Sequence, residues 1–389
     1  MSDRDNRVHF DMSTEATGVV VAFRAPAGEP IRAHELSVIG TIARAIARLK
    51  GFSFREDVAG VTNKAGNHYF VPDDSLLAAD AARLGIRGPE HLYGGVVPWH
   101  FVKTKAITHP LLDGSADRPN GWRSQFGEAT CMAVLPGYTV FSRSDALRAA
   151  ERLLRRGPVR LKPPLFSRGS GQVVATTFRD FERLMERFSS SDLETCGLVL
   201  ETNIHAIITL SVGITRINEI EVGYHGTQTT TLDNKGRAVY GASHLNVLRG
   251  GWRALQNSDH PLTLKLAVEQ AQAYDAAMAN YPGFFASRRN YDVGQGIDSS
   301  GIWRSGVLEA SWRVGGSSSA ELAAIELMNA DPEIRTVRVS AVKQYGKDCR
   351  PPEAADIHFQ GDDPEEGLIT RYTVVLQAKR RLPGQSFSS

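Results

Sequence analysis

The sequence predicts a mixed fold, part α/β and part α+β, in which a small α/β layer precedes a larger sheet-rich part. Strand and helix patterns alternate over residues 18–98, the order that gives a layered sheet with right-handed crossovers. Residues 159–175 indicate two short strands around a glycine loop, and residues 288–326 indicate a hairpin followed by a helix. A chain of 389 residues is long enough for two or three domains with sizeable cores.

Three patterns predict the N-terminal strands and helices: short apolar runs, apolar residues at helical spacing, and glycines at the ends of helices. Apolar residues of the first helix recur at intervals of three and four, which predicts one buried face. We expect, in order, a strand over Gly18–Phe23, a helix over Ala33–Lys50 ended by Gly51, a strand over His68–Pro72, a helix over Leu76–Leu84 capped by Asp73 and Asp74, and a closing strand over Gly94–Pro98.

The middle of the chain begins with a stretch rich in Gly, Asp and Pro over residues 112–127, which is typical of a loop. The patterns after it predict a strand pair, or a strand and a turn, over Met132–Val134 and Tyr138–Phe141. They further predict a helix over Asp145–Arg156 opened by Ser144, strands at Val159–Lys162 and Gln172–Ala175, a helix over Phe178–Phe188 and a strand over Gly197–Ile204.

The C-terminal half contains more strands than helices. We expect strands at Ile207–Ile214 and Glu219–Gly223, a hairpin around Asp233–Gly236, a polar loop over His244–Arg253, a helix over Leu262–Tyr281, the hairpin of residues 288–311, a helix over Ser319–Asn329, a strand over 335–345, a loop over Asp348–Gly367 and a last strand over Leu368–Ala378.

Composition excludes several classes of function. The chain is 42% hydrophobic and 23% charged, with a net charge of +2, so it offers no case for binding nucleic acid or an anionic membrane. Its three cysteines are far apart and lack metal-ligand spacing, which favours a reducing compartment without disulfides. We find no segment that predicts a membrane span or a signal peptide. A cytoplasmic enzyme is the expectation.

The hairpin of residues 288–311 carries the strongest chemical signal. In an extended chain alternate residues share a face, so Glu309, Ser311 and Arg313 project together. Pairing of the two strands brings Asp292 close to that row. Carboxylates are ligands for Mg²⁺, and a guanidinium suits phosphate oxygens. A salt bridge at a strand end is the simpler interpretation of any single Asp–Arg pair.

A second signal lies at the start of the middle region. Lys162 ends a strand, two prolines follow it, and Arg168-Gly169-Ser170-Gly171 forms a small-residue loop. A lysine beside a glycine loop is suited to phosphate, because backbone N–H groups and one ammonium face the anion. The same residues also suit a plain hairpin turn. They match neither the P-loop nor the dinucleotide fingerprint.

Taken together, the order of these elements resembles the ATP-grasp superfamily over about residues 18–330, ending in the stretch LEASWR. Within it, the chain looks like a proteobacterial group of unknown function that is sometimes labelled biotin carboxylase. The resemblance implies an ATP-grasp fold with an N-terminal Rossmann-like pre-grasp layer. It divides the chain into a tail over 1–17, a pre-grasp domain over 18–110, a lid subdomain over 111–204, a metal-bearing subdomain over 205–378 and a tail over 379–389.

The resemblance also implies ATP and Mg²⁺ as cofactors and gives roles to single residues. Lys162 would hold the α- and β-phosphates, and Lys105 would be the second phosphate lysine, with Lys103 as the alternative. Residues 168–171 would cover the phosphates, and Glu201, Thr202 and Asn203 would form the hinge against adenine. Asp292, Glu309 and Ser311 would bind the metal, although the usual residue at position 311 is Asn. No acidic ribose ligand follows the hinge, where His205 stands instead.

The implied reaction is an ADP-forming ligation of a small-molecule carboxylate to an amine through an acyl phosphate. Arg313 would stabilise the transferring phosphoryl group. Further candidates for substrate contacts and bases are Arg249, Arg253, Arg288, Arg289, His225 and His244. Two alternatives stay open: another ATP-grasp phosphoryl transfer, such as a kinase or biotin-carboxylase-like reaction, and a non-catalytic nucleotide-binding protein, which Ser311 favours. A homodimer is common among such relatives.

Overall fold

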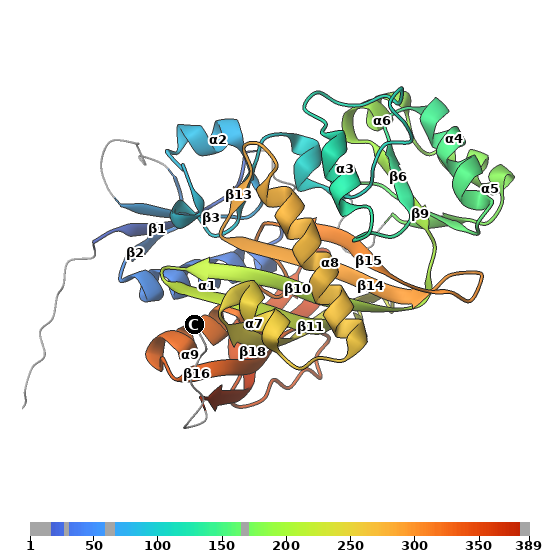
Figure 1. The fold of residues 1–389 in the computed structure, drawn as a ribbon. Helices are drawn as coiled ribbons and strands as arrows, with labels where there is room; N and C mark the ends of the chain where they lie inside the picture. Colours follow the sequence, from blue (N-terminus) through green and yellow to red (C-terminus); the bar gives the residue numbers. More distant parts are fainter. Residues whose placement is uncertain (1–16, 27–30, 59–66, 165–170, 382–389) are drawn as a thin grey trace, which may run out of the picture.

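The computed structural model describes residues 17–26, 31–58, 67–164 and 171–381. Within these residues the strands form four sheets, of three, eight, three and four strands. The large sheet lies at the centre, the first strands lie beside one end of it, and the four-stranded sheet with its helices lies beyond the other (Figure 1). The predicted mixture of α/β and α+β parts is confirmed.

The N-terminal layer is a parallel sheet in the order β2-β1-β3, formed by β1 (Val19–Phe23), β2 (Ser53–Arg55) and β3 (His68–Pro72). Helix α1 (Ala33–Lys50) has the predicted bounds. It ends at Gly51, whose φ of +66° is a left-handed conformation that glycine adopts without strain. A short 3₁₀ helix, η1 (Pro89–His91), follows the layer.

The prediction for residues 73–98 is partly wrong. Leu76 and Leu77 form strand β4 (Leu76–Leu77), which pairs with β5 (Gly95–Val97) and extends a small sheet ending in β13 (Phe285–Ala286). Helix α2 (Ala78–Arg83) therefore starts later than expected, and no side chain caps it. Asp73 instead accepts a hydrogen bond from the Ala25 amide, which ties two loops of the layer together.

The four-stranded sheet has the order β6-β9-β7-β8 and is antiparallel. Its core is made by apolar residues of these strands and of the helices that pack on them. The elements of this region are η2 (His100–Lys103), η3 (Lys105–Thr108), α3 (Ser124–Thr130), β6 (Gly137–Val140), α4 (Arg143–Leu154), β7 (Val159–Lys162), β8 (Val173–Ala175), α5 (Phe178–Met185), α6 (Ser190–Cys196) and β9 (Leu198–Thr202).

Several local predictions in this region need correction. Met132–Val134 is not a strand, and α3 lies partly in the stretch expected to be a loop. Ser142, not Ser144, caps α4, because its hydroxyl accepts the Asp145 amide. Of the predicted phosphate loop, Arg168, Gly169 and Ser170 lie outside the described residues, whereas Gly171 is described and has a φ of +72°.

The large sheet has eight antiparallel strands in the order β15-β14-β10-β11-β12-β16-β18-β17. The stretch His244–Arg253, predicted as a loop, is instead the end of a strand and the start of a helix, and the predicted loop over Asp348–Gly367 contains a strand. The bounds are β10 (His205–Ile217), β11 (Ile220–Leu232), β12 (Ala238–Arg249), β14 (Arg288–Ile297), β15 (Trp303–Ser311), β16 (Ile334–Tyr345), β17 (Asp356–Asp363) and β18 (Gly367–Arg380).

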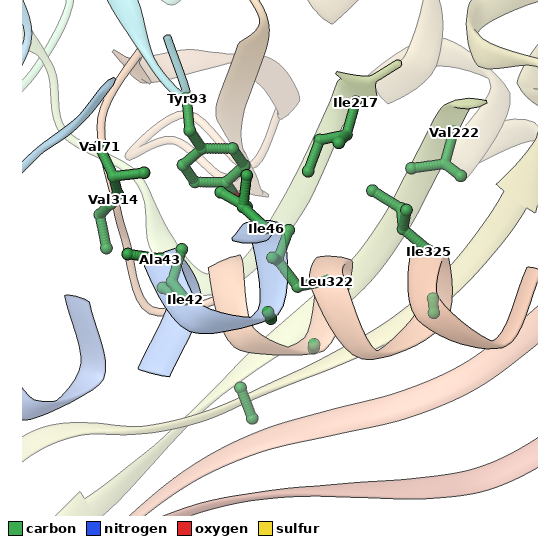
Figure 2. Packing of buried hydrophobic residues seen from close by; sticks show 14 of the residues in the cluster. Ile42, Ala43, Ile46, Val71, Tyr93, Ile217, Val222, Val314, Leu322 and Ile325 are labelled. Carbon is green, nitrogen blue, oxygen red and sulfur yellow. The ribbon is translucent and has the colours of Figure 1, made fainter. Parts of the chain in front are cut away.

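Helices cover both faces of this sheet. On one face, α1 and α9 (Ser318–Ala330) lie side by side and bury Ile46 and Ile325 against strand residues such as Val222 (Figure 2). On the other face, α7 (Gly251–Asn257) and α8 (Leu262–Ala279) lie over the strands, with α8 crossing β10, β14 and β15 (Figure 1). Within the described residues, no helix is long and apolar enough to cross a membrane.

Candidate active site

The acidic pair of the predicted hairpin forms the centre of the candidate site. Asp292 of β14 and Glu309 of β15 are direct partners across the strands, so their side chains share a face of the sheet. Val293 then pairs with Val307, which leaves Leu308 as the extra residue of a β-bulge. Two carboxylates held side by side repel each other, so this site favours a cation.

The surroundings of Asp292 fix the position of its carboxylate. One of its oxygens accepts hydrogen bonds from Gln228 at 2.9 Å, from Asn290 at 3.0 Å and from Ser211 at 3.3 Å. Burial, and then the charge of Glu309, raise the pKa of Asp292 above its ordinary value. The three donors favour the ionised form but do not fully offset these two effects. A bound divalent cation would lower that pKa again.

Lys105 approaches the pair from the short helix η3. Its side chain is buried, and its ammonium nitrogen lies 3.4 Å from a carboxylate oxygen of Glu309. The neighbouring Lys103 points elsewhere, with its ammonium 2.6 Å from Asp74 in the N-terminal layer. The structure therefore brings Lys105 to the acidic pair and leaves Lys103 as a link to Asp74.

Lys162 reaches the same site from the four-stranded sheet. Its ammonium donates to the two oxygens of Glu201 at 3.0 and 3.1 Å and to the Leu308 carbonyl at 3.1 Å. That carbonyl belongs to the bulge residue, beside Glu309. His109 contacts the same Glu201 carboxylate at 3.1 Å. A single lysine thus joins the predicted hinge strand to the hairpin that carries the acidic pair.

The ionisation of Glu201 is controlled by this contact. Burial opposes the charged form, but the charge of Lys162 and the hydrogen bonds from His109 and Lys162 outweigh burial and lower the pKa of Glu201 to about 2. Because its pKa in the folded state lies below the ordinary 4.5, Glu201 stabilises the fold fully above about pH 4.5 and loses this effect as the pH falls toward 2.

This difference predicts a measurable dependence of stability on pH. Between pH 7 and pH 3, protonation of Glu201 on unfolding should remove on the order of 2 kcal/mol of unfolding free energy. The Glu201→Gln variant should lack this part of the acid sensitivity. Urea unfolding of both proteins at several pH values measures it. Parallel pH curves for the two proteins would mean that Glu201 titrates in the folded protein as it does in the unfolded chain.

The backbone of the predicted hinge residues makes hydrogen bonds within the protein. The Thr202 amide donates to the Pro136 carbonyl at 2.8 Å, and the Asn203 amide donates to the Pro158 carbonyl at 2.9 Å. The Asn203 side chain accepts a hydrogen bond from Arg160 at 2.7 Å. Both amides are therefore committed within the protein, and an adenine ring at this strand would meet the carbonyl groups or the side chains instead.

Arg313 and Ser311 continue the hairpin toward the N-terminal layer. Arg313 is partly exposed, and its Nε lies 3.9 Å from the Asp74 carboxylate. Ser75 donates a hydrogen bond to the Trp312 carbonyl at 3.1 Å, which holds the loop after β3 against the end of the hairpin. Ser311 pairs with Asn290 in the ladder. We call the boundary between the hairpin and the N-terminal layer the seam. It is lined by Arg313, Lys103 and Asp74.

Other residues singled out from the sequence lie in structural contacts. Arg288 is buried and donates to Glu321 of α9 at 2.7 Å, while Arg289 contacts Asp275 at 3.2 Å. Arg249 donates to the carbonyl of Met328 in the last turn of α9 and to that of Ile334 at the start of β16. The chain that follows the hairpin enters α9 at the opposite end of this helix. At a rise of 1.5 Å per residue, that end lies about 15 Å from Met328. Each of these arginines is held by contacts within the fold, and a contact with substrate stays a prediction.

The two candidate bases also lie away from the acidic pair. His244 contacts the Ser340 hydroxyl at 2.8 Å across neighbouring strands. His225 pairs with Val212, the residue next to Ser211, so its side chain projects from the sheet face opposite Asp292. Arg253 lies in α7, exposed on that second face.

The sequence reasoning missed the residues that hold the predicted ones in place. Asn290 stands two residues before Asp292, so the alternation of a strand could have identified it. Ser211 and Gln228 come from β10 and β11, and only the register of those strands brings them to Asp292. His109 and Asp74 lie in irregular segments that carry no periodic signal.

These contacts fit Mg²⁺ and a nucleotide phosphate. Two carboxylates supply hard oxygen ligands, and two buried lysines stand beside them. Within the described residues, no group of three or more His, Cys, Asp and Glu side chains is placed to hold a metal. Asp292 and Glu309 would therefore supply only some of the ligands of a magnesium ion, and water and phosphate oxygens would supply the others, as is common for this ion.

The comparison with solved structures identifies the class of fold. N5-carboxyaminoimidazole synthetase from Staphylococcus aureus aligns over 92% of this chain and 94% of its own, with a TM-score of 0.52 and 12% identity. Its ADP complex aligns with a TM-score of 0.52, 13% identity and coverage of 92% and 93%. Biotin carboxylase from Campylobacter jejuni aligns over 93% and 87%, with a TM-score of 0.49 and 12% identity. The chain has the ATP-grasp fold.

The sequence itself assigns the family. Residues 23–373 match the DUF3182 family, which is described as a protein family of unknown function, and the chain belongs to it. No curated protein matches the sequence.

Proposed function

We propose that this protein is an ATP- and Mg²⁺-dependent, ADP-forming ligase that activates a small-molecule carboxylate and joins it to an amine. One observation carries the proposal: Lys105 contacts Glu309 of the acidic pair, and Lys162, from a different element, contacts the carbonyl of the neighbouring Leu308 on the same hairpin. Cations for phosphate and carboxylates for a metal are needed together in phosphoryl transfer.

Each residue of this cluster has a defined task in the proposed reaction. Lys162 and Lys105 neutralise phosphate charge, and Glu201 orients Lys162. Asp292 and Glu309 would hold Mg²⁺, with the Ser311 hydroxyl beside them. The ion would neutralise the charge of the phosphate oxygens and hold them in position. Asn290 and Gln228 keep the Asp292 carboxylate in place.

The seam between the hairpin and the N-terminal layer is the proposed place for the carboxylate. There Arg313 and Lys103 present positive charge, partly balanced by Asp74. A carboxylate oxygen would attack the γ-phosphorus, and the bond from phosphorus to ADP would break. The amine nitrogen would then attack the acyl carbon, release inorganic phosphate and lose a proton. The protein's contribution is position and charge.

The two neighbouring lysines allow a matched test of nucleotide binding. Lys105→Met should weaken Mg²⁺-dependent binding of a non-hydrolysable ATP analogue by about tenfold or more, because a charge-assisted contact contributes about 1.5–3 kcal/mol. Lys103→Met should change that affinity by less than about threefold, since Lys103 faces Asp74. Isothermal titration calorimetry measures both.

The wild-type protein is the first control in this titration. Absence of any Mg²⁺-dependent binding of the analogue to the wild type would contradict the proposed function. A larger loss of affinity in Lys103→Met than in Lys105→Met would move the phosphate site toward Asp74. Thermal unfolding of each variant without nucleotide shows whether the fold is retained.

A further inference from the structure

The molecule contains a cavity that lies apart from the acidic pair. It has a volume of about 550 Å³ and lies between the large sheet and the loop that joins α7 to α8. Its floor includes His225, whose side chain projects from the sheet face opposite Asp292. The sheet therefore separates this cavity from the candidate active site.

The floor of the cavity is an ordered row of polar side chains. Direct cross-strand pairing places His225 beside Asn246, Asn246 beside Arg338, and Arg338 beside Gln377. These four residues come from β11, β12, β16 and β18 and face the cavity together. Two residues along, Thr336 pairs with Lys379 on the same face. The register of the sheet thus places two exposed cationic side chains and several hydrogen-bonding groups on one face, beside the cavity.

The wall of the cavity supplies a second histidine. His260, in the loop before α8, contacts the His225 ring edge to face, with 4.6 Å between ring centroids. The Nε2 atom of His260 is buried and has no hydrogen-bond partner in the described structure. An unpaired buried nitrogen is costly, and a bound ligand can satisfy it. Leu248 and Leu264 add apolar surface beside the two rings.

The charge of the cavity is positive near neutral pH. Burial, together with the neighbouring His260, lowers the pKa of His225 to about 4, and burial also lowers the pKa of His260, so both rings are neutral at pH 7. The positive charge therefore comes from Arg338 and Lys379. The acidic residue at the rim, Asp259, is fully exposed and lies 3.8 Å from Lys265.

We propose that this cavity is a binding site for a small organic anion, with its carboxylate or phosphate held by Arg338 and Lys379 and its body against His225 and His260. A guanidinium pairs with either group through two hydrogen bonds, and Lys379 adds a point charge. The volume lies in the range of small-molecule sites. The site is distinct from the proposed nucleotide site, and its occupation does not depend on the proposed ligase reaction.

The test is calorimetric titration of the full chain with two probes, inorganic phosphate and citrate, at constant ionic strength set with chloride. We expect saturable 1:1 binding of at least one probe. Arg338→Gln and Lys379→Gln should each weaken it by about tenfold or more, because each removes a charge-assisted contact. Binding of phosphate but not citrate would indicate a phosphorylated ligand. Binding of citrate but not phosphate would indicate a carboxylate ligand.

Two control variants locate the binding. Arg183→Gln removes an exposed charge from α5, and Lys105→Met alters the proposed nucleotide site; binding should survive in both. Thermal unfolding checks the fold of every variant. The inference is overturned if neither probe binds saturably, if Arg338→Gln and Lys379→Gln leave binding intact, or if Arg183→Gln or Lys105→Met weakens it as much as they do.

Discussion

Replacing Glu309 by Gln should lower Mg²⁺-dependent turnover by about 10²–10³-fold, the size of effect seen when one preorganised electrostatic group is removed from an active site. The substitution keeps the shape of the side chain and removes one of the two carboxylates that face each other across the hairpin. The proposed metal would lose a charged ligand, and the phosphate oxygens would lose the ion that holds them.

The same substitution should change stability little, because it removes both a repulsion, with Asp292, and an attraction, the ion pair with Lys105. The charge of Glu309 contributes to the raised pKa of Asp292, so the two carboxylates destabilise each other in the folded protein. Removing one charge relieves this repulsion. A loss of activity without a loss of unfolding free energy is therefore the expected signature of a site kept for function.

Glu326→Gln is the matched control for Glu309→Gln. Glu326 lies on the surface of α9, where it contacts Arg48 at 2.8 Å. Turnover and its Mg²⁺ dependence should be unchanged in this variant, because exposed pairs of this kind contribute little. Retention of full activity in Glu309→Gln would exclude the acidic pair as the metal site.

Lys162→Met should have the second large effect, on both stability and activity. The substitution leaves the Glu201 carboxylate buried with His109 as its remaining side-chain partner. Breaking a buried ion pair by removing one member costs about 3–5 kcal/mol. ATP turnover should also fall by about 10²-fold, because the ammonium that bridges the hinge strand and the hairpin is lost.

A double variant separates these two consequences. In Lys162→Met/Glu201→Gln the uncompensated charge is gone, so most of the lost unfolding free energy should return. Activity should not return, because no cation faces the phosphates from β7. Recovery of both properties in the double variant would show that Lys162 serves only to neutralise Glu201. Urea unfolding and single-turnover ATP hydrolysis give the two readouts.

The hairpin could be predicted from sequence because its signal is local. Alternation along β15 places Glu309 and Ser311 on one face, and the polar turn requires the two strands to pair. The helix Ala33–Lys50 was predicted with its true bounds for the same reason, since its apolar spacing and its terminal glycine both lie within the segment.

Elsewhere the decisive information was not local. Residues 244–247 alternate polar and apolar side chains, and the polar residues with the glycine pair that follows suggest a loop. In the structure Asn246 lines a cavity, while Leu245 and Val247 lie in the core. Likewise, no sequence pattern predicts that the lysine of η3, and not that of η2, lies beside Glu309.

Substrate-stimulated ADP release by the purified protein tests the central claim most directly. ATP and Mg²⁺ would be supplied with a panel of amino acids and dipeptides as carboxylates and amines, and Asp292→Asn would be assayed beside the wild type. The proposal predicts ADP release that rises with one carboxylate–amine pair, requires Mg²⁺ and is lost in the variant. Stimulated ADP release that persists undiminished in Asp292→Asn, or that needs no Mg²⁺, would contradict it.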